Sequence, residues 1–195
     1  MPRKDDIQHS VLIVSSSEQF DAIVKKSLRP GNFMSIDFRK NASLARRGIL
    51  ERFYDMIIIN APLPDDNGIE LSMDLAEKCN ASVLLVVPKE IYDEVLNKVT
   101  DYGILSIAKP FPKGRLDQSV RFLIANQNRI GVLERKIRSA EEKMEEQRIV
   151  TKAKFLLVEQ KHMTEDEAHR LIGKTAMDNG ISRARAAERI MDDLD

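Results

Sequence analysis

The sequence predicts an α/β fold with a five-stranded parallel sheet, followed by a long helix and a small all-helical unit. From residue 10 to about 126, short runs of branched apolar residues alternate with longer stretches of helical spacing, which is typical of repeated βα units. The apolar runs are continuous, as in strands that are buried on both faces. No proline occurs from residue 113 to residue 195, so a long uninterrupted helix can form there.

The elements of the sheet can be placed in order along the chain. The predicted strands are residues 10–14, 34–38, 56–59, 82–87 and 103–108. Helical spacing follows them at residues 18–28, 41–52, 68–79, 90–101 and from 113 onward. In such a doubly wound sheet, ligands bind where the carboxyl ends of the strands meet. That edge is therefore where we expect the chemistry of the N-terminal part.

The composition narrows the class of protein. The 31 Lys and Arg residues balance 31 Asp and Glu residues, so no domain-wide basic surface indicates nucleic acid. The single Cys79 excludes a disulfide framework and a multi-cysteine metal site. The apolar run at residues 11–14 is too short for a signal peptide or a membrane span. We expect a cytoplasmic protein that uses no metal, no cofactor and no membrane.

The long helix carries an apolar seam. Its seam positions, at spacings of three, four and seven, are Leu123, Ile130, Leu133, Ile137 and Met144. Charged residues flank them, which favours a short parallel coiled coil and a dimer. Asn126 and Gln147 interrupt the seam, so only two or three good heptads remain. The alternative is an amphipathic helix that folds back on its own domain.

Residues 151–195 contain clear helix boundaries. Thr164 and Glu167 have the spacing of a capping box, which begins a helix. Asn179-Gly180 is a good left-handed terminator, and Ser182 can cap a last helix. Counting the end of the long helix at residues 153–161, the segment predicts three helices. Their expected inward residues are Phe155 in the first, Ala168, Leu171, Ile172, Thr175 and Ala176 in the second, and Ala187, Ile190, Met191 and Leu194 in the third.

Two stretches of the chain resemble known families. Pro64 and Gly68 after the third strand, with Lys109-Pro110-Phe111 after the fifth, resemble a response-regulator receiver domain. The C-terminal part resembles an ANTAR domain, the three-helix RNA-binding unit of transcription antiterminators, in the pattern Ala153-x-x-x-Leu157, Thr164-x-x-Glu167-Ala168, Leu171 and Ala176-Met177. The resemblance implies a flavodoxin-like, CheY-like domain at residues 8–126, a coiled-coil linker at 127–150 and an ANTAR unit at 151–195.

The receiver chemistry itself is not expected. It requires a carboxylate nucleophile, carboxylates that hold Mg²⁺ and a cation on the phosphoryl oxygens. In the stretch DMIIINAPLPDDNG, residues 55–68, the strand ends at Asn60, whose amide is a poor nucleophile. The other positions of this degenerate acceptor site are Ser15, Ser16, Val87 and Lys109, with Ser106 at the aromatic switch position. We expect a pseudo-receiver that is not phosphorylated, in which Lys109 hydrogen-bonds the Asn60 carbonyl oxygen.

Asp65 and Asp66 follow Asn60 in a turn, and they are the nearest acids that could restore the chemistry. Turns favour aspartate for local reasons, so we expect solvated carboxylates there and not a replacement acceptor.

The resemblance implies a dimeric RNA-binding antitermination regulator that holds tandem stem-loops in leader transcripts, with a sensory partner protein or ligand acting on the pseudo-receiver. Candidate phosphate contacts are Lys154, Arg170, Lys174, Arg183, Arg185 and Arg189. Residues 151–195 hold eight Lys and Arg against nine Asp and Glu. Judged from charge alone, these basic residues are more simply interpreted as a solvated face than as an RNA-binding surface. The rival function is a protein-interaction adaptor. No nucleophile is paired with a base, so an enzyme is not expected.

Overall fold

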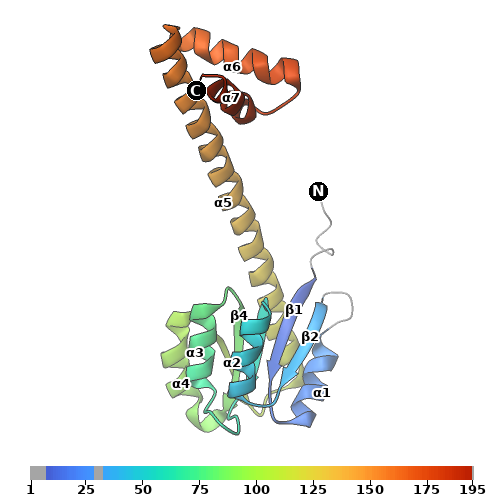
Figure 1. Cartoon of the computed structure of the whole chain (residues 1–195). Helices are drawn as coiled ribbons and strands as arrows, with labels where there is room; N and C mark the ends of the chain where they lie inside the picture. Colours follow the sequence, from blue (N-terminus) through green and yellow to red (C-terminus); the bar gives the residue numbers. More distant parts are fainter. Residues whose placement is uncertain (1–7, 29–32, 195) are drawn as a thin grey trace. The chain divides into compact units, whose positions relative to one another are not determined.

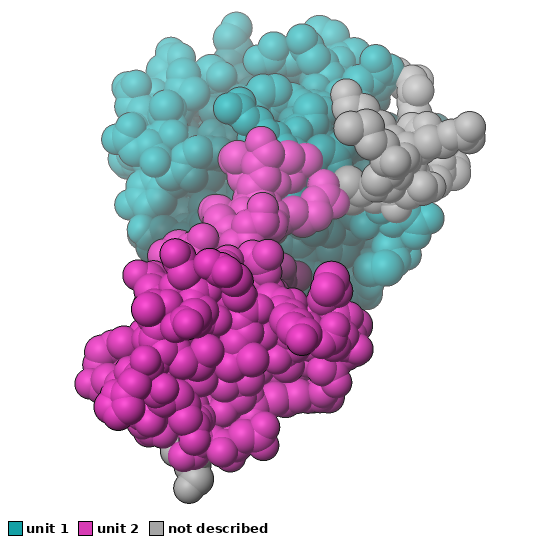
Figure 2. All heavy atoms as spheres, turned by 90° about the horizontal axis from the view of Figure 1, so that it is seen from above, with its two compact units in different colours: residues 1–131 teal, residues 132–195 magenta. Residues whose placement is uncertain are grey.

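The computed structural model describes residues 8–28 and 33–194 (Figure 1). The chain divides into two compact units, residues 1–131 and residues 132–195, which Figure 2 shows in teal and magenta. Helix α5, Lys113–Lys161, is continuous through the boundary, so each unit contains one part of it. The two units are therefore described separately.

The first unit is built on a five-stranded parallel sheet. Its strands are β1 His9–Val14, β2 Phe33–Arg39, β3 Met56–Asn60, β4 Ser82–Pro88 and β5 Leu105–Lys109. The order in the sheet is β2-β1-β3-β4-β5, and all four pairings are parallel. All five predicted strands are confirmed. The continuous apolar runs are explained because β1, β3 and most of β4 are buried on both faces.

Helices cover the two faces of this sheet (Figure 1). Their bounds are α1 Glu18–Ser27, α2 Ala42–Glu51, α3 Ile69–Lys78 and α4 Tyr92–Val99, with short 3₁₀ turns at Lys89–Ile91 and Thr100–Tyr102. One core lies between the sheet and α2, α3 and α4. The other core lies between the sheet and α1 with the first turns of α5. The unit is thus a three-layer doubly wound fold, as the sequence predicts.

The loop after β3 explains the spacing of Gly68 from Asn60. Gly68 has φ +83°, a left-handed conformation that side chains disfavour. A Cβ at this position would lie only 2.8 Å from the Cβ of Ala61. Glycine is therefore required here both by the backbone conformation and by the close approach of the loop to the end of the strand.

Of the two aspartates of this loop, Asp65 is exposed, as expected, whereas Asp66 is half-buried, and both also bond to protein groups. Asp65 accepts hydrogen bonds from the backbone N–H groups of Ala42 and Ser43, at 2.8 and 3.0 Å. These bonds satisfy open donors in the first turn of α2 and lower the pKa of Asp65 to about 2. The Asp66 carboxylate lies 3.1 Å from the guanidinium of Arg46. Both residues hold the loop against α2.

The beginning of α5 belongs to the core of the first unit. Leu123 is 2% exposed and packs in the same cluster as Leu116 and Val120. Its assignment to an exposed dimer seam is therefore wrong, because the sheet already covers this side chain. The next turn is fixed by hydrogen bonds, since the Gln127 amide donates to the Asn80 carbonyl at 2.8 Å and His9 contacts Asn128 at 3.2 Å.

The second unit contains three helices, as predicted: the end of α5, α6 Glu165–Asn179 and α7 Arg183–Asp192. The capping box is confirmed, since the Glu167 N–H donates to the Thr164 hydroxyl at 3.3 Å and the Thr164 N–H donates to the Glu167 carboxylate at 2.8 Å. Gly180 ends α6 with φ +62°, and Ser182 caps α7. The predicted boundaries of these helices rest on local hydrogen bonds and are accurate for that reason.

The core of this unit is made mainly of small side chains. Its buried members are Ala153, Leu157, Ala168, Ile172, Ala176, Ala186 and Ala187. Two residues expected inside are exposed, namely Leu171 at 36% and Phe155 at 60%. Phe155 lies two residues from both Ala153 and Leu157, which places it on the opposite face of the helix from the core.

In the part of the chain that the structure describes, no helix is both long and apolar enough to cross a bilayer.

Candidate functional site

The carboxyl edge of the sheet brings three of the predicted site residues together. Ser15 follows β1, Asn60 ends β3 and Lys109 ends β5. The Lys109 ammonium donates to the Asn60 side-chain carbonyl at 2.9 Å and to the backbone carbonyl of Ala61 at 2.6 Å. The Asn60 amide nitrogen donates to the Ser15 hydroxyl at 3.2 Å. The expected hydrogen bond between Lys109 and Asn60 is confirmed.

The remaining predicted positions do not add chemistry to this edge. Ser16 is exposed, and its side chain has no hydrogen bond to another of the described residues. Val87 is fully buried and offers only apolar surface. The hydroxyl of Ser106 is shielded from solvent without a hydrogen-bond partner among the described residues. The set is therefore one cation, one amide and one hydroxyl, arranged in a chain of hydrogen bonds.

One carboxylate beside this edge was not identified from the sequence. Asp21, in the first turn of α1, lies next to Ser15, and its pKa is raised mainly by burial. One of its carboxylate oxygens is shielded from solvent without a hydrogen-bond partner among the described residues. Helix periodicity gives no sign of this placement, because it depends on how α1 packs on the sheet.

These residues do not fit a divalent cation. Mg²⁺ in such sites is held by carboxylate and carbonyl oxygens, usually from two or more acidic side chains. The Asn60 oxygen that would face the ion already accepts a bond from the Lys109 ammonium. Burial lowers the pKa of Lys109 below its ordinary range. Among residues 8–28 and 33–194, no group of three His, Cys, Asp or Glu side chains could hold a metal.

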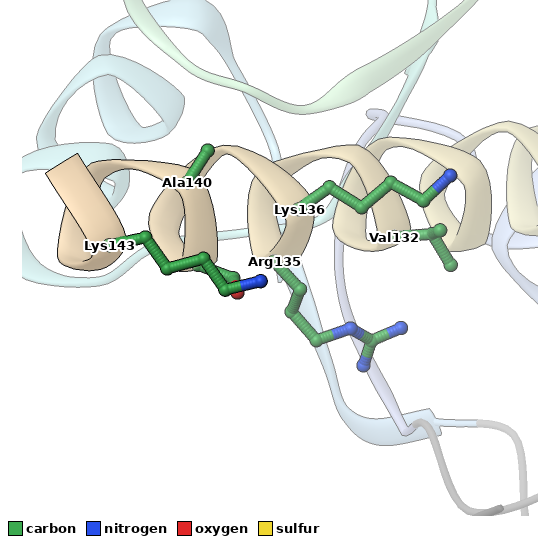
Figure 3. A pocket seen from close by; sticks show the side chains of 6 residues that line it. Val132, Arg135, Lys136, Ala140 and Lys143 are labelled. Carbon is green, nitrogen blue, oxygen red and sulfur yellow. The ribbon is translucent and has the colours of Figure 1, made fainter.

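The second candidate surface lies on α5 beyond residue 129. Ile130 is half-buried, whereas Leu133, Ile137 and Met144 are exposed, with Ile137 at 58%. Beside this seam a shallow depression is lined by Val132, Arg135, Lys136, Ser139, Ala140 and Lys143 (Figure 3). Arg135, Lys136 and Lys143 extend long basic side chains from the helix, and Ala140 adds a short one (Figure 3). Such an alternation of small and long side chains can receive residues of another helix.

The third candidate surface is the basic face of the second unit. Arg170 and Lys174 are one turn apart on α6, and Arg185 and Arg189 are one turn apart on α7. These four side chains and Arg183 belong to exposed residues. Lys154 differs, because its side chain is only 20% exposed and its ammonium forms an ion pair with Glu165 at 2.5 Å. Lys154 holds α5 against the start of α6, so it is less available than the other five residues to contact a phosphate.

Comparison with a protein-family model identifies the second unit. The model of the ANTAR domain matches residues 138–191. The match begins within α5, inside the segment predicted as a coiled-coil linker, and includes all of α6 and nearly all of α7.

Curated relatives cover more of the chain. The transcriptional regulatory protein PdtaR of Mycobacterium tuberculosis is 26% identical over 141 residues, which are 72% of this chain and 68% of PdtaR. The response regulator ArlR of Staphylococcus epidermidis is 26% identical over 120 residues, which are 60% of this chain and 53% of ArlR. This chain therefore spans about half the length of ArlR.

Solved structures match the fold of the first unit. The signal receiver domain of an HD domain-containing protein from Pseudomonas fluorescens Pf-5 aligns with a TM-score of 0.55 and 21% identity, covering 62% of this chain and 90% of that one. The chemotaxis response regulator CheY4 of Vibrio cholerae aligns with a TM-score of 0.51 and 16% identity, covering 60% and 98%. At these identities the likeness shows the fold alone.

Proposed function

We propose that this chain, which joins a CheY-like receiver fold to an ANTAR domain, is a dimeric transcription regulator that binds RNA and prevents termination. The observation that carries the proposal is the ANTAR match over residues 138–191, together with two exposed cationic pairs on the helices that it includes. The relative named as a transcriptional regulatory protein supports the same class of function. The RNA would be a pair of stem-loops in a leader transcript, and the protein would act in the cytoplasm.

The receiver-like unit acts without phosphorylation in this proposal. Asn60 replaces the nucleophilic carboxylate, and its oxygen is bonded to Lys109. The hydrogen-bond chain through Ser15 holds the site in one arrangement, since its groups are mutually paired. Regulation would then come from a sensory partner protein or a ligand that binds the receiver-like unit.

The dimer would form through the exposed part of the α5 seam, residues Ile130, Leu133, Ile137 and Met144. Apolar side chains in this helical pattern seldom remain in water over several turns unless a partner covers them. A dimer also presents two ANTAR units together, so a second stem-loop binds at high effective concentration once the first is held.

Binding of the full-length protein to a panel of tandem stem-loop RNAs at two salt concentrations tests the proposal. Each binding reaction is repeated with a small phosphodonor and Mg²⁺. We expect binding that weakens steeply as salt rises and that ignores the phosphodonor. Binding that appears only with the phosphodonor would contradict the role assigned to Asn60.

A matched pair of variants separates RNA contact from general charge. Arg185→Gln with Arg189→Gln removes two cations from α7, and the slope of log affinity against log salt should become shallower by between 1 and 2, on the order of one per phosphate contact. Arg115→Gln with Arg121→Gln makes the same charge change on the receiver part of α5 and should leave RNA affinity nearly unchanged. Equal effects of both pairs, or no RNA binding by the wild-type chain, would favour the protein-interaction adaptor.

A further inference from the structure

Phe155 is the one phenylalanine of the ANTAR unit, which has no tyrosine or tryptophan, and it contributes nothing to the core. Its side chain is 60% exposed, whereas Ala153 and Leu157 on either side of it are buried. The core of the unit is complete without it. Its ring therefore leaves an aromatic face open at the surface of the unit, where a flat ligand could stack.

The surroundings of Phe155 are basic, unlike the rest of the unit. Residues 148–161 hold four Lys and Arg and one Glu, whereas residues 165–194 hold five Lys and Arg and seven Asp and Glu. Arg148 and Lys152 precede Phe155 by seven and three residues, so all three lie on one face of α5. Both cations belong to exposed residues, and the guanidinium of Arg148 also lies 3.5 Å from the exposed carboxylate of Glu145. Along the helix axis this stripe is about 10 Å long, at 1.5 Å per residue.

We propose that Phe155 is a stacking platform for an unpaired nucleobase, with Arg148 and Lys152 contacting the phosphates that flank it. This inference rests on the proposed RNA-binding function and names the chemistry that its RNA must offer, a splayed base in a single-stranded loop. Aromatic rings beside a cationic track bind single strands in this way, because every base has a flat face that can stack. The stripe lies on the face of α5 opposite to the core of the unit, so it would add a contact separate from the basic pairs of α6 and α7.

The first test compares two exposed phenylalanines of the same helix in the full chain. Phe155→Ala should weaken binding about 5- to 140-fold, the range that corresponds to loss of one base stack. The probe is a tandem stem-loop RNA with randomised loops, enriched on the wild-type protein. Phe122→Ala is the matched control, since Phe122 is 59% exposed but lies in the receiver unit, and RNA affinity should not change. Both side chains are exposed, so both variants should fold.

Salt dependence and an abasic probe distinguish stacking from a charge effect. Phe155→Ala should leave the slope of log affinity against log salt unchanged, whereas Lys152→Gln should reduce it by about 1. Removing the stacked base from the RNA should weaken its binding to the wild-type protein as much as Phe155→Ala weakens binding of the intact RNA. The two changes together should cost no more than either one alone.

A fluorescence test reads the contact directly, because the chain contains no tryptophan. Phe155→Trp introduces a single indole that a stacked base should quench, whereas Phe122→Trp should not respond to RNA. Wild-type affinity in Phe155→Ala overturns the inference and leaves the proposed function in place. Weaker dimerisation of Phe155→Ala in sedimentation also overturns it, since the ring would then contact a second copy of the chain. If the wild-type protein enriches no RNA from the pool, the proposed function fails, and the inference fails with it.

Discussion

Leu123 and Ile137 occupy equivalent positions of the same apolar seam, fourteen residues apart on α5, yet the structure gives them opposite surroundings. Leu123 is 2% exposed in the core of the receiver unit, and Ile137 is 58% exposed. Replacing each by alanine therefore removes similar apolar volume from two different places. We expect Leu123→Ala to lower stability and Ile137→Ala to weaken dimer association.

The expected magnitudes follow from burial. Leu123→Ala leaves a cavity in a packed core, which costs about 2–5 kcal/mol of the free energy of unfolding of the receiver unit. Ile137→Ala should cost the isolated chain less than about 0.5 kcal/mol, because the side chain is already in water. In a dimer, covering the exposed 58% of this side chain yields about 1–2 kcal/mol per chain. Both copies lose it, so dimer association should weaken by about 30- to 700-fold.

Urea unfolding at high dilution and sedimentation equilibrium over a range of protein concentrations measure the two effects. Leu123→Ala should shift the urea midpoint and leave self-association of the folded protein unchanged. Ile137→Ala should do the reverse. The reasoning is refuted if Ile137→Ala dimerises like the wild type, which would mean that the seam is not the dimer contact. It is equally refuted if Ile137→Ala unfolds as easily as Leu123→Ala in dilute solution, since α5 would then fold back on its own domain.

Four further outcomes can be checked by stability measurements. Gly68→Ala should lower the free energy of unfolding, measured in urea, by about 2 kcal/mol or more, because φ is +83° and the new Cβ would lie 2.8 Å from the Cβ of Ala61. Wild-type stability of this variant would mean that the loop relaxes freely. His162 has the left-handed φ of 54°, which glycine adopts more easily, so His162→Gly should stabilise the folded state by up to about 1 kcal/mol. Amide exchange in α6 should become slower, and faster exchange would contradict this. Thr164→Ala should lose about 1 kcal/mol with the capping box, seen as faster exchange of the first-turn N–H groups of α6, and unchanged exchange would count against the cap. The pKa of Asp65 falls from 3.8 to about 2 on folding, so the folded state binds fewer protons between these values. Its stabilising contribution is complete above about pH 4 and disappears as the pH falls toward 2; Asp65→Asn should flatten this part of the acid profile of the urea midpoint, and an unaltered profile would refute the assignment.

The elements of this fold could be predicted from the sequence because their signals are local. The apolar run of β3, the capping box of α6 and the left-handed Gly180 are set by groups a few residues apart. The bond between Lys109 and Asn60 was also predictable, although 49 residues separate them, because parallel strands end at the same edge of the sheet.

Other features depended on what packs against each face, which periodicity does not reveal. The sequence determined that Leu123 and Ile137 share a stripe of α5, but only the tertiary structure decided that the sheet covers the first and not the second. The same limit applies to Phe155, whose apolar character suggested a core position before α6 and α7 were seen to pack on the opposite face of the helix. Asp65 stabilises α2 from a loop 23 residues further along the chain, and no local sequence pattern predicts that contact. Local hydrogen bonds and side-chain spacing involve residues that are close in the sequence, so the sequence alone predicts them. Which side chains become buried depends on contacts between segments that are distant in the sequence, and only the tertiary structure shows those contacts.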